Sequence, residues 1–307
     1  CIRDRYRANY ALFAMYASDF ETGDTEARGA LEISPDYYNA WLPIAIKAIV
    51  DGDFEAARSA YESMALSSAQ GAPLAEIGLG DLAIFTGDFE AGREHLRRAV
   101  ELATADDNQY VAATAHMAIA FAYEAEGNLE AAQEASASAL QAASGEPWIV
   151  QAALLHIAAG NIEAAAEIAA DLTNQLQPQT RAYGMLIEGL IAHSNGRIVD
   201  AIEKLSAGLE LADFWLIRFY LGRIYLDAGY HAEAVDEFTQ CMDRRGEASA
   251  LFLDDISTFR YVAPVYYWLG VAQQELFMSA AATTSFETFL QLRPNGGVLV
   301  DDARERL

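Results

Sequence analysis

One short pattern recurs along the chain at regular distances. A glycine is followed by Asp or Asn, a large apolar residue, Glu and then two small residues at 52–57, 87–92, 127–132 and 160–165. Glycine readily adopts the left-handed conformation that ends a helix, and an Asp or Asn next to it caps the start of another. The pattern therefore predicts a tight turn between two helices, repeated along the chain.

Looser copies of this turn begin at Ser18, Gly196, Gly229 and Phe277. From residue 18 to 277, the successive turns are 34, 35, 40, 33, 36, 33 and 48 residues apart. Five of these intervals lie near the period of about 34 residues that is typical of tetratricopeptide repeats. Seven residues before each turn the chain carries a small residue, as that repeat also does: Ala11, Ala45, Gly80, Ala120, Ala153, Gly189, Gly222 and Gly270.

The chain thus resembles the tetratricopeptide-repeat family, and the resemblance implies an all-α, right-handed α-solenoid of about eight helix pairs. Residues 1–307 are expected to form one solenoid, because each pair can bury its apolar face only against its neighbours. We expect regular repeats over 1–245, an insertion at 246–257, and the last helix pair with a C-terminal capping helix over 258–307. Strand-like alternation is not visible anywhere.

The insertion is predicted because residues 244–257 interrupt the repeat. This stretch contains Gly246, an apolar run at 251–253, and the acidic pair Asp254 and Asp255. We expect a short helix here rather than a plain turn. The acidic pair has no base, nucleophile or third ligand near it in the sequence, so we interpret it as capping or docking the insertion.

The formal net charge is −25 at pH 7. Nucleic-acid binding requires a basic face, so this charge argues against a nucleic-acid partner and against an anionic membrane surface. A basic partner or a salty habitat remains compatible with it. No apolar run approaches the roughly 20 residues of a membrane span, so we expect no membrane insertion.

Motifs for catalysis, metals and cofactors are missing from the sequence. There is no His-Glu-x-x-His, Cys-x-x-Cys, Gly-x-Ser-x-Gly or Walker loop. We therefore expect no cofactor, no metal and no catalytic residue. His116 and His156 are interpreted as core or edge residues, and Cys241 as a buried packing thiol.

The concave face of the expected solenoid is the candidate binding surface, because the first helix of each pair lines it. Its apolar character excludes the basic clamp that holds acidic peptide tails, and favours a protein or peptide partner with an apolar helix or extended segment. The alternative is that superhelical winding closes the groove on itself. The candidate residues are Leu42, Ile46, Ile77, Asp81, Met117, Phe121, Leu154, Tyr183, Leu186, Leu190, His193, Phe219, Arg223 and Tyr267.

A more specific resemblance covers residues 222–226, 237–238, 241–246, 250–255, 258–261, 264 and 266–270. These stretches resemble the C-terminal tetratricopeptide region of large bacterial serine/threonine protein kinases. The likeness extends over most of the chain and is specific after about residue 180. It implies a non-catalytic sensory or docking module with a kinase domain upstream. The glycine-rich loop, His-Arg-Asp and Asp-Phe-Gly of such kinases are missing from this sequence.

Two other functions stay open from the sequence. The first is a small-ligand sensor or helical enzyme with a pocket near the insertion, formed by Arg223, Asp254, Asp255, Arg260 and Tyr267. The second is a stand-alone lipoprotein scaffold, in which Cys1 would carry the lipid. The compartment and the oligomeric state do not follow from the sequence; a kinase attachment would imply the bacterial cytoplasm or the outer side of the inner membrane.

Overall fold

The computed structural model describes residues 2–250 and 259–307. Within these ranges the chain forms seventeen α-helices, two 3₁₀ helices and no strand. The predicted all-α solenoid is confirmed. Asp254 and Asp255 lie outside the described residues, as does Cys1.

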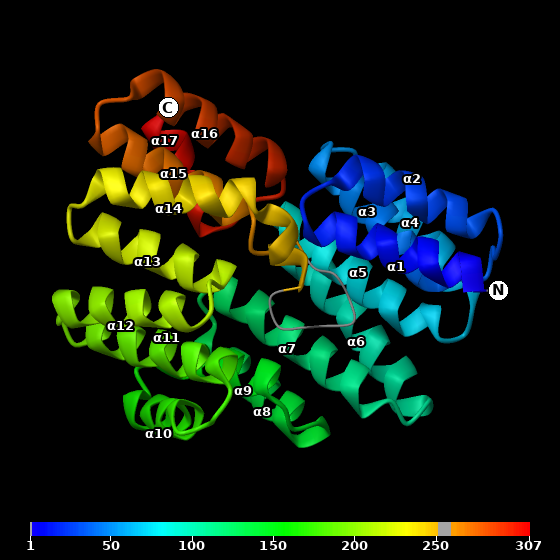
Figure 1. Ribbon diagram of the computed structural model, residues 1–307, viewed down its shortest axis with the longest axis horizontal. Helices are drawn as coiled ribbons and strands as arrows, with labels where there is room; N and C mark the ends of the chain where they lie inside the picture. Colours follow the sequence, from blue (N-terminus) through cyan, green and yellow to red (C-terminus); the bar gives the residue numbers. More distant parts are fainter. Residues whose placement is uncertain (1, 251–258) are drawn as a thin grey trace.

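Sixteen of the helices form eight pairs, as the repeat predicts (Figure 1). The last helix, α17 (Val298–Arg306), packs on α15 and α16. The pairs are α1 (Ile2–Tyr16) with α2 (Phe20–Leu31), α3 (Trp41–Val50) with α4 (Phe54–Ser67), α5 (Gly71–Thr86) with α6 (Phe89–Ala105), α7 (Gln109–Ala125) with α8 (Leu129–Ala142), α9 (Glu146–Ala158) with α10 (Ile162–Thr173), α11 (Pro178–Ser194) with α12 (Ile198–Leu211), α13 (Trp215–Asp227) with α14 (His231–Asp243), and α15 (Ala263–Glu275) with α16 (Ser279–Leu292).

The turns between paired helices use the chemistry that the sequence pattern predicts. The glycines at positions 52, 87, 127, 160, 196 and 229 all have φ between 73° and 90°, which is the left-handed region. Asp53, Asp88 and Asn128 then cap the following helices, because their side-chain oxygens accept hydrogen bonds from backbone N–H groups at 3.0–3.2 Å. Asn161, at the same position of its turn, makes no such side-chain hydrogen bond. The left-handed glycine is therefore common to these six turns, and the side-chain cap is present in only some of them.

Small residues in the first helix of a pair let the second helix approach. A Cβ atom added to Gly222 would lie 2.8 Å from the ring of Phe238, and one added to Gly270 would lie 2.8 Å from the ring of Phe286. Both rings are buried. The alternation of small and large positions in the sequence is therefore a packing requirement within each pair.

The short helices mark irregular connections. The 3₁₀ helix η1 (Tyr38–Ala40) leads into α3, and η2 (Arg245–Ala250) follows α14 at the start of the expected insertion. Figure 1 shows η2 beside α1, at the other end of the sequence. The Gly246 N–H donates to the Ser18 hydroxyl at 2.9 Å.

The last repeat also meets the early ones. The Asn295 N–H donates to the carbonyl oxygen of Thr86 at 3.0 Å, and the Arg293 guanidinium donates to the carbonyl oxygen of Ile84 at 3.4 Å. These carbonyls lie at the C-terminal end of α5, where the helix dipole attracts a cation. The last repeat therefore closes the superhelix by contacting the third helix pair. None of the described helices is long and apolar enough to span a membrane.

Candidate functional site

Residues 259–262, which lead into α15, contact helices that are far away in the sequence. Phe259 lies against Phe20 and Phe85, with ring centroids 6.2 Å away in both cases. Tyr261 contacts Phe121 edge to face at 4.9 Å and donates a hydrogen bond to the Gln151 side chain at 3.3 Å. This segment therefore bridges α2, α5, α7 and α9 from the inside.

Arg260 ties the same segment to α5. Its guanidinium lies 2.6 Å from the Asp81 carboxylate, and the two side chains are 1% and 5% exposed. The guanidinium also lies 5.4 Å from the ring centroid of Phe121. A buried carboxylate is stable only when it is paired, so Asp81 is committed to this internal ion pair.

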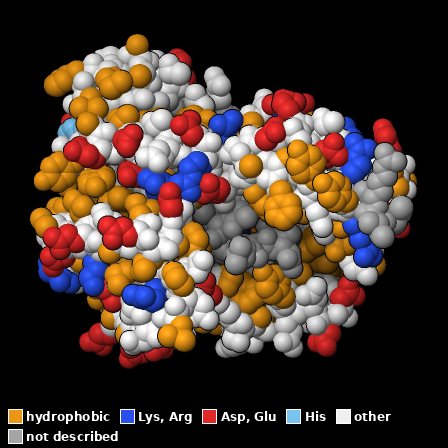
Figure 2. Space-filling model, in the orientation of Figure 1, with side chains coloured by type: hydrophobic (Ala, Val, Ile, Leu, Met, Phe, Trp, Pro, Cys, Tyr) orange, Lys and Arg blue, Asp and Glu red, His pale blue; other side chains and the backbone are white. Residues whose placement is uncertain are grey.

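One cavity, which we call the wide groove, lies at the N-terminal ends of the first helices of several pairs. It has a volume of about 840 Å³ and mostly apolar walls. Hydrophobic side chains lie at several places on the face shown in Figure 2. The lining residues are Leu12, Phe13, Tyr16, Tyr38, Asn39, Gln70, Leu74, Asn108, Val111, Glu146, Gln179, Tyr183, Phe214, Trp215, Leu216 and Glu247.

A second cavity, the narrow pocket, lies toward the C-terminal ends of α7 and α13. It has a volume of about 220 Å³ and is lined by both apolar and polar side chains. Tyr261 forms part of its wall. The lining residues are Met117, Phe121, Glu124, Ala125, Gln151, Leu154, Leu155, Phe219, Tyr220, Arg223, Tyr261, Pro264, Trp268 and Leu299.

Opposite charges line the narrow pocket. Burial raises the pKa of the Glu124 carboxyl above its ordinary value, and the positive charge of Arg223 opposes that rise. The Arg223 guanidinium lies over the Trp268 ring, 4.6 Å from its centroid. Burial likewise raises the pKa of the Tyr220 hydroxyl. The pocket therefore offers a desolvated acid and a stacked cation beside apolar walls.

Comparisons with known proteins agree with this architecture. A family model described as tetratricopeptide repeat matches residues 77–106, which span the turn between α5 and α6. Residues 77–106 thus match a tetratricopeptide repeat, and the described helix pairs form an α-solenoid around it. A search among curated proteins finds no significant sequence match.

Solved structures share the solenoid's fold at low identity. One is a chain of the APC/C hetero-tetramer Cut9–Hcn1, with a TM-score of 0.50 and 16% identity over 96% of this chain and 53% of that chain. Another is the human IFIT1 dimer with m7Gppp-AAAA, with a TM-score of 0.52 and 15% identity over 97% of this chain and 71% of that chain. The solenoid thus spans about half the length of the Cut9–Hcn1 chain that it matches.

The fourteen candidate residues for the concave binding face do not all line one cavity. Met117, Phe121, Leu154, Phe219 and Arg223 line the narrow pocket, and Tyr183 lines the wide groove. The remaining aliphatic candidates are buried in the core: Leu42, Ile46, Ile77, Leu186 and Leu190.

The polar candidates outside the two cavities have partners within the solenoid. His193 Nε2 lies 3.0 Å from the Asp227 carboxylate. The buried Tyr267 donates a hydrogen bond to Asp302 at 2.5 Å. Burial, together with this hydrogen bond, raises the pKa of Tyr267 to about 12. Of the described residues proposed for a pocket near the insertion, only Arg223 lines the narrow pocket; Arg260 and Tyr267 do not.

Several cavity residues were missed by sequence reasoning. Glu124 stands at the end of α7, directly before a turn, where an acidic residue is ordinarily solvated. Tyr220 lies three residues before the candidate Arg223 on α13, so the two share a face of the helix. This spacing could have indicated that Tyr220 lines the same cavity. Trp268 lies in the stretch 266–270 that resembles the kinase C-terminal region, but no pattern in the sequence indicates that it lines a cavity. Among the described residues no group of three or more potential ligands could hold a metal ion.

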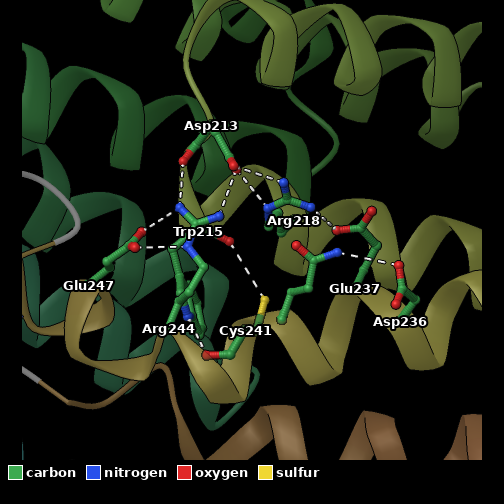
Figure 3. A network of polar contacts seen from close by, with 9 residues as sticks. Asp213, Trp215, Arg218, Asp236, Glu237, Cys241, Arg244 and Glu247 are labelled. Carbon is green, nitrogen blue, oxygen red and sulfur yellow. Dashed lines mark hydrogen bonds and ion pairs between the residues drawn. The ribbon is translucent and has the colours of Figure 1, made fainter. Parts of the chain in front are cut away.

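A polar network secures one rim of the wide groove (Figure 3). The Asp213 carboxylate accepts hydrogen bonds from the Arg218 guanidinium at 2.6 Å and the Arg244 guanidinium at 2.9 Å. These hydrogen bonds lower the pKa of the Asp213 carboxyl. Arg244 also binds Glu247 at 2.7 Å. The Trp215 indole N–H donates to the carbonyl oxygen of Cys241 at 2.8 Å. The network therefore holds two groove residues, Trp215 and Glu247, in place.

Cys241 itself is buried in α14, as predicted. Its side chain is inaccessible to solvent, and burial strongly raises the pKa of its thiol. A thiol in such surroundings stays protonated and unreactive. It is therefore a packing residue of the seventh helix pair.

Proposed function

We propose that this chain is a protein-interaction and regulatory scaffold that binds a protein partner in the wide groove. The observation that carries this proposal is an exposed aromatic at the groove. Phe13 is 69% exposed while its neighbour Met15 is completely buried. An apolar cavity of about 840 Å³ with a large exposed ring is suited to the side chains of a docked segment.

The chemistry of the groove favours an apolar segment with a basic flank. Leu74, Val111 and Leu216 supply aliphatic contacts, whereas Glu146 and Glu247 supply negative charge. The net charge of −25 acts in the same direction, because it attracts basic segments and repels phosphate backbones. We therefore propose a protein rather than a nucleic-acid partner. The docked segment would be an apolar helix or an extended strand.

The resemblance of residues 222–270 to the C-terminal region of bacterial serine/threonine kinases supports a finer proposal. In the intact protein, this solenoid would serve a kinase as a substrate-docking or regulatory region. We assign no catalytic step to the solenoid itself. Its contribution would be to raise the local concentration of a bound partner near the catalytic domain.

A peptide selection followed by matched variants tests the groove. Displayed peptides that combine an apolar helix with flanking lysines are selected on the purified solenoid, and their affinities are measured by fluorescence anisotropy. Phe13→Asp should weaken binding more than tenfold, because it places a charge against the apolar segment. Tyr6→Asp is the control, since Tyr6 is 73% exposed on the same helix and does not line the groove. Equal affinities for the wild type and Phe13→Asp would contradict the proposal.

A further inference from the structure

The narrow pocket is a separate compartment from the wide groove, and the proposed scaffold function does not use it. Its walls come from α7, α9, α13 and α15 together with Tyr261. At about 220 Å³ it is smaller than the 300–1,000 Å³ of sites for drug-sized molecules. The volume fits a ligand of about the size of one amino acid.

One side of this pocket is apolar. Phe121, Leu154 and Phe219 face it, and Phe219 is 7% exposed. Met117, which is 2% exposed, adds a side chain that adapts to irregular shapes. Burial of a branched aliphatic or aromatic group against these walls would be favourable, because it removes apolar surface from water.

The polar side carries two opposite charges that do not neutralise each other by contact. Among the described residues, no ion pair or hydrogen bond joins Glu124 to Arg223, and no carboxylate lies within 4 Å of the Arg223 guanidinium. Within the described part of the chain, that guanidinium stacks on the Trp268 ring. Desolvation acts strongly enough on Glu124 to raise its pKa. Glu124 and Arg223 act on each other through space, since the charge of Arg223 opposes the rise in the pKa of Glu124, but neither contacts the other. A ligand that contacts both side chains with its own opposite charges would therefore be stabilised.

We propose that the narrow pocket binds a free α-amino acid with a branched aliphatic or aromatic side chain. Arg223 binds its carboxylate, Glu124 binds its ammonium group, and the side chain occupies the apolar wall. A plain carboxylic acid would be repelled by Glu124, and a plain amine by Arg223. A peptide terminus offers only one of the two charges, so the free amino acid is the best match. The solenoid would then act as a sensor of that ligand as well as a scaffold.

Isothermal titration calorimetry on the full chain tests this proposal with defined probes. Leucine and phenylalanine are titrated, followed by 4-methylpentanoate, which lacks the amino group, and leucinamide, which lacks the carboxylate. At least one of the two amino acids should bind, and each analogue of leucine should bind more than tenfold more weakly than leucine if leucine is the ligand. The corresponding phenylalanine analogues, 3-phenylpropionate and phenylalaninamide, serve if phenylalanine is the ligand. Absence of binding by both amino acids would overturn the proposal. Binding of an analogue as tight as that of its amino acid would also overturn it.

Variants then locate the bound ligand. Arg223→Met and Glu124→Gln keep the size of each side chain and remove its charge, and each should weaken binding more than tenfold. Arg98→Met is the control, because Arg98 is exposed on α6 and does not line the pocket. Undiminished binding in both variants would place the ligand elsewhere and refute the assignment.

A spectroscopic readout keeps the proposal testable if either variant fails to fold. Binding near Trp268 should change its fluorescence, and the change should be lost in Trp268→Phe while the other tryptophans remain. A ligand-induced change that survives in Trp268→Phe would contradict binding at this pocket. Peptide affinity for the wide groove, measured in parallel with Arg223→Met, separates the two proposals. The peptide affinity of Arg223→Met should equal that of the wild type, even though this variant no longer binds the amino acid.

Discussion

Arg260 and Asp81 form a buried ion pair although they are 179 residues apart in the chain, with a nitrogen–oxygen distance of 2.6 Å. Asp81 belongs to the third helix pair, whereas Arg260 precedes the eighth. The pair therefore fastens the centre of the closed superhelix. Together with the Phe259 contacts, it also fills the space between the first helices of several pairs.

Removing one partner of this ion pair should be strongly destabilising, because the other charge would remain buried. We expect Arg260→Met to lower the free energy of unfolding by about 3–5 kcal/mol, and Asp81→Leu to do the same. The double variant Arg260→Met with Asp81→Leu should lose much less than the sum of the two. Urea unfolding of the wild type, the two single variants and the double variant, monitored by circular dichroism, gives the four free energies of this double-mutant cycle.

An exposed pair offers the control for this cycle. Arg28 and Asp24 lie 2.8 Å apart, and the Arg28 side chain is 60% exposed. Arg28→Met should change stability by less than about 1 kcal/mol. Additive losses in the Arg260 and Asp81 cycle would show that the two side chains are not energetically coupled.

Gly246→Ala should open the closed superhelix. An added Cβ would overlap the carbonyl oxygen of Met15 and lie 2.6 Å from the amide nitrogen of Ser18, and neither backbone atom can move away as a side chain could. Hydrogen exchange should therefore become faster in α1 and η2 and stay unchanged in α9 and α10. Ser18→Ala, which removes only the oxygen that accepts the Gly246 N–H, should have a smaller effect in the same regions. Unaltered exchange of α1 in Gly246→Ala would contradict this role.

Gly222→Ala should destabilise the seventh helix pair by about 1–3 kcal/mol through overpacking against Phe238. Since the added Cβ would press against the Phe238 ring, a smaller side chain at position 238 should relieve the steric overlap. The combination of Gly222→Ala with Phe238→Leu should therefore lose less stability than the two single losses added together. Thermal and urea unfolding of the four proteins would measure this compensation. Strictly additive losses would indicate that the glycine serves another purpose.

Asp213 should contribute a pH-dependent stabilisation. Hydrogen bonds from Arg218 and Arg244 lower the pKa of its carboxyl below the ordinary value of 3.8. A carboxyl with a depressed pKa in the folded state stabilises the fold above its unfolded pKa, and this contribution is lost as the pH falls from near 3.8 through the folded value. When the pH is lowered from 6 to below 3.8, the free energy of unfolding should therefore decline less in Asp213→Asn than in the wild type. Asp301→Asn, on an exposed carboxylate, should leave the decline unchanged.

The local parts of this fold could be predicted from the sequence because they depend on residues close together in the chain. Gly87 ends one helix with a φ of 90°, and Asp88 caps the next through a 3.1 Å hydrogen bond. Gly222 and Phe238 fit together because both belong to one helix pair. Each of these features is set by backbone conformation or by packing between adjacent helices. The repeat pattern therefore predicted the eight pairs and their turns.

The closure of the superhelix and the two cavities were decided by the tertiary structure. The rotation from one helix pair to the next depends on many side-chain volumes, and its small differences accumulate over eight pairs. Only the summed rotation brings Arg260 to Asp81 and places Glu124 near Arg223 in one pocket. No local period in the sequence encodes such contacts. The sequence by itself determined what each repeat is, and the accumulated geometry of all repeats determined which side chains meet inside.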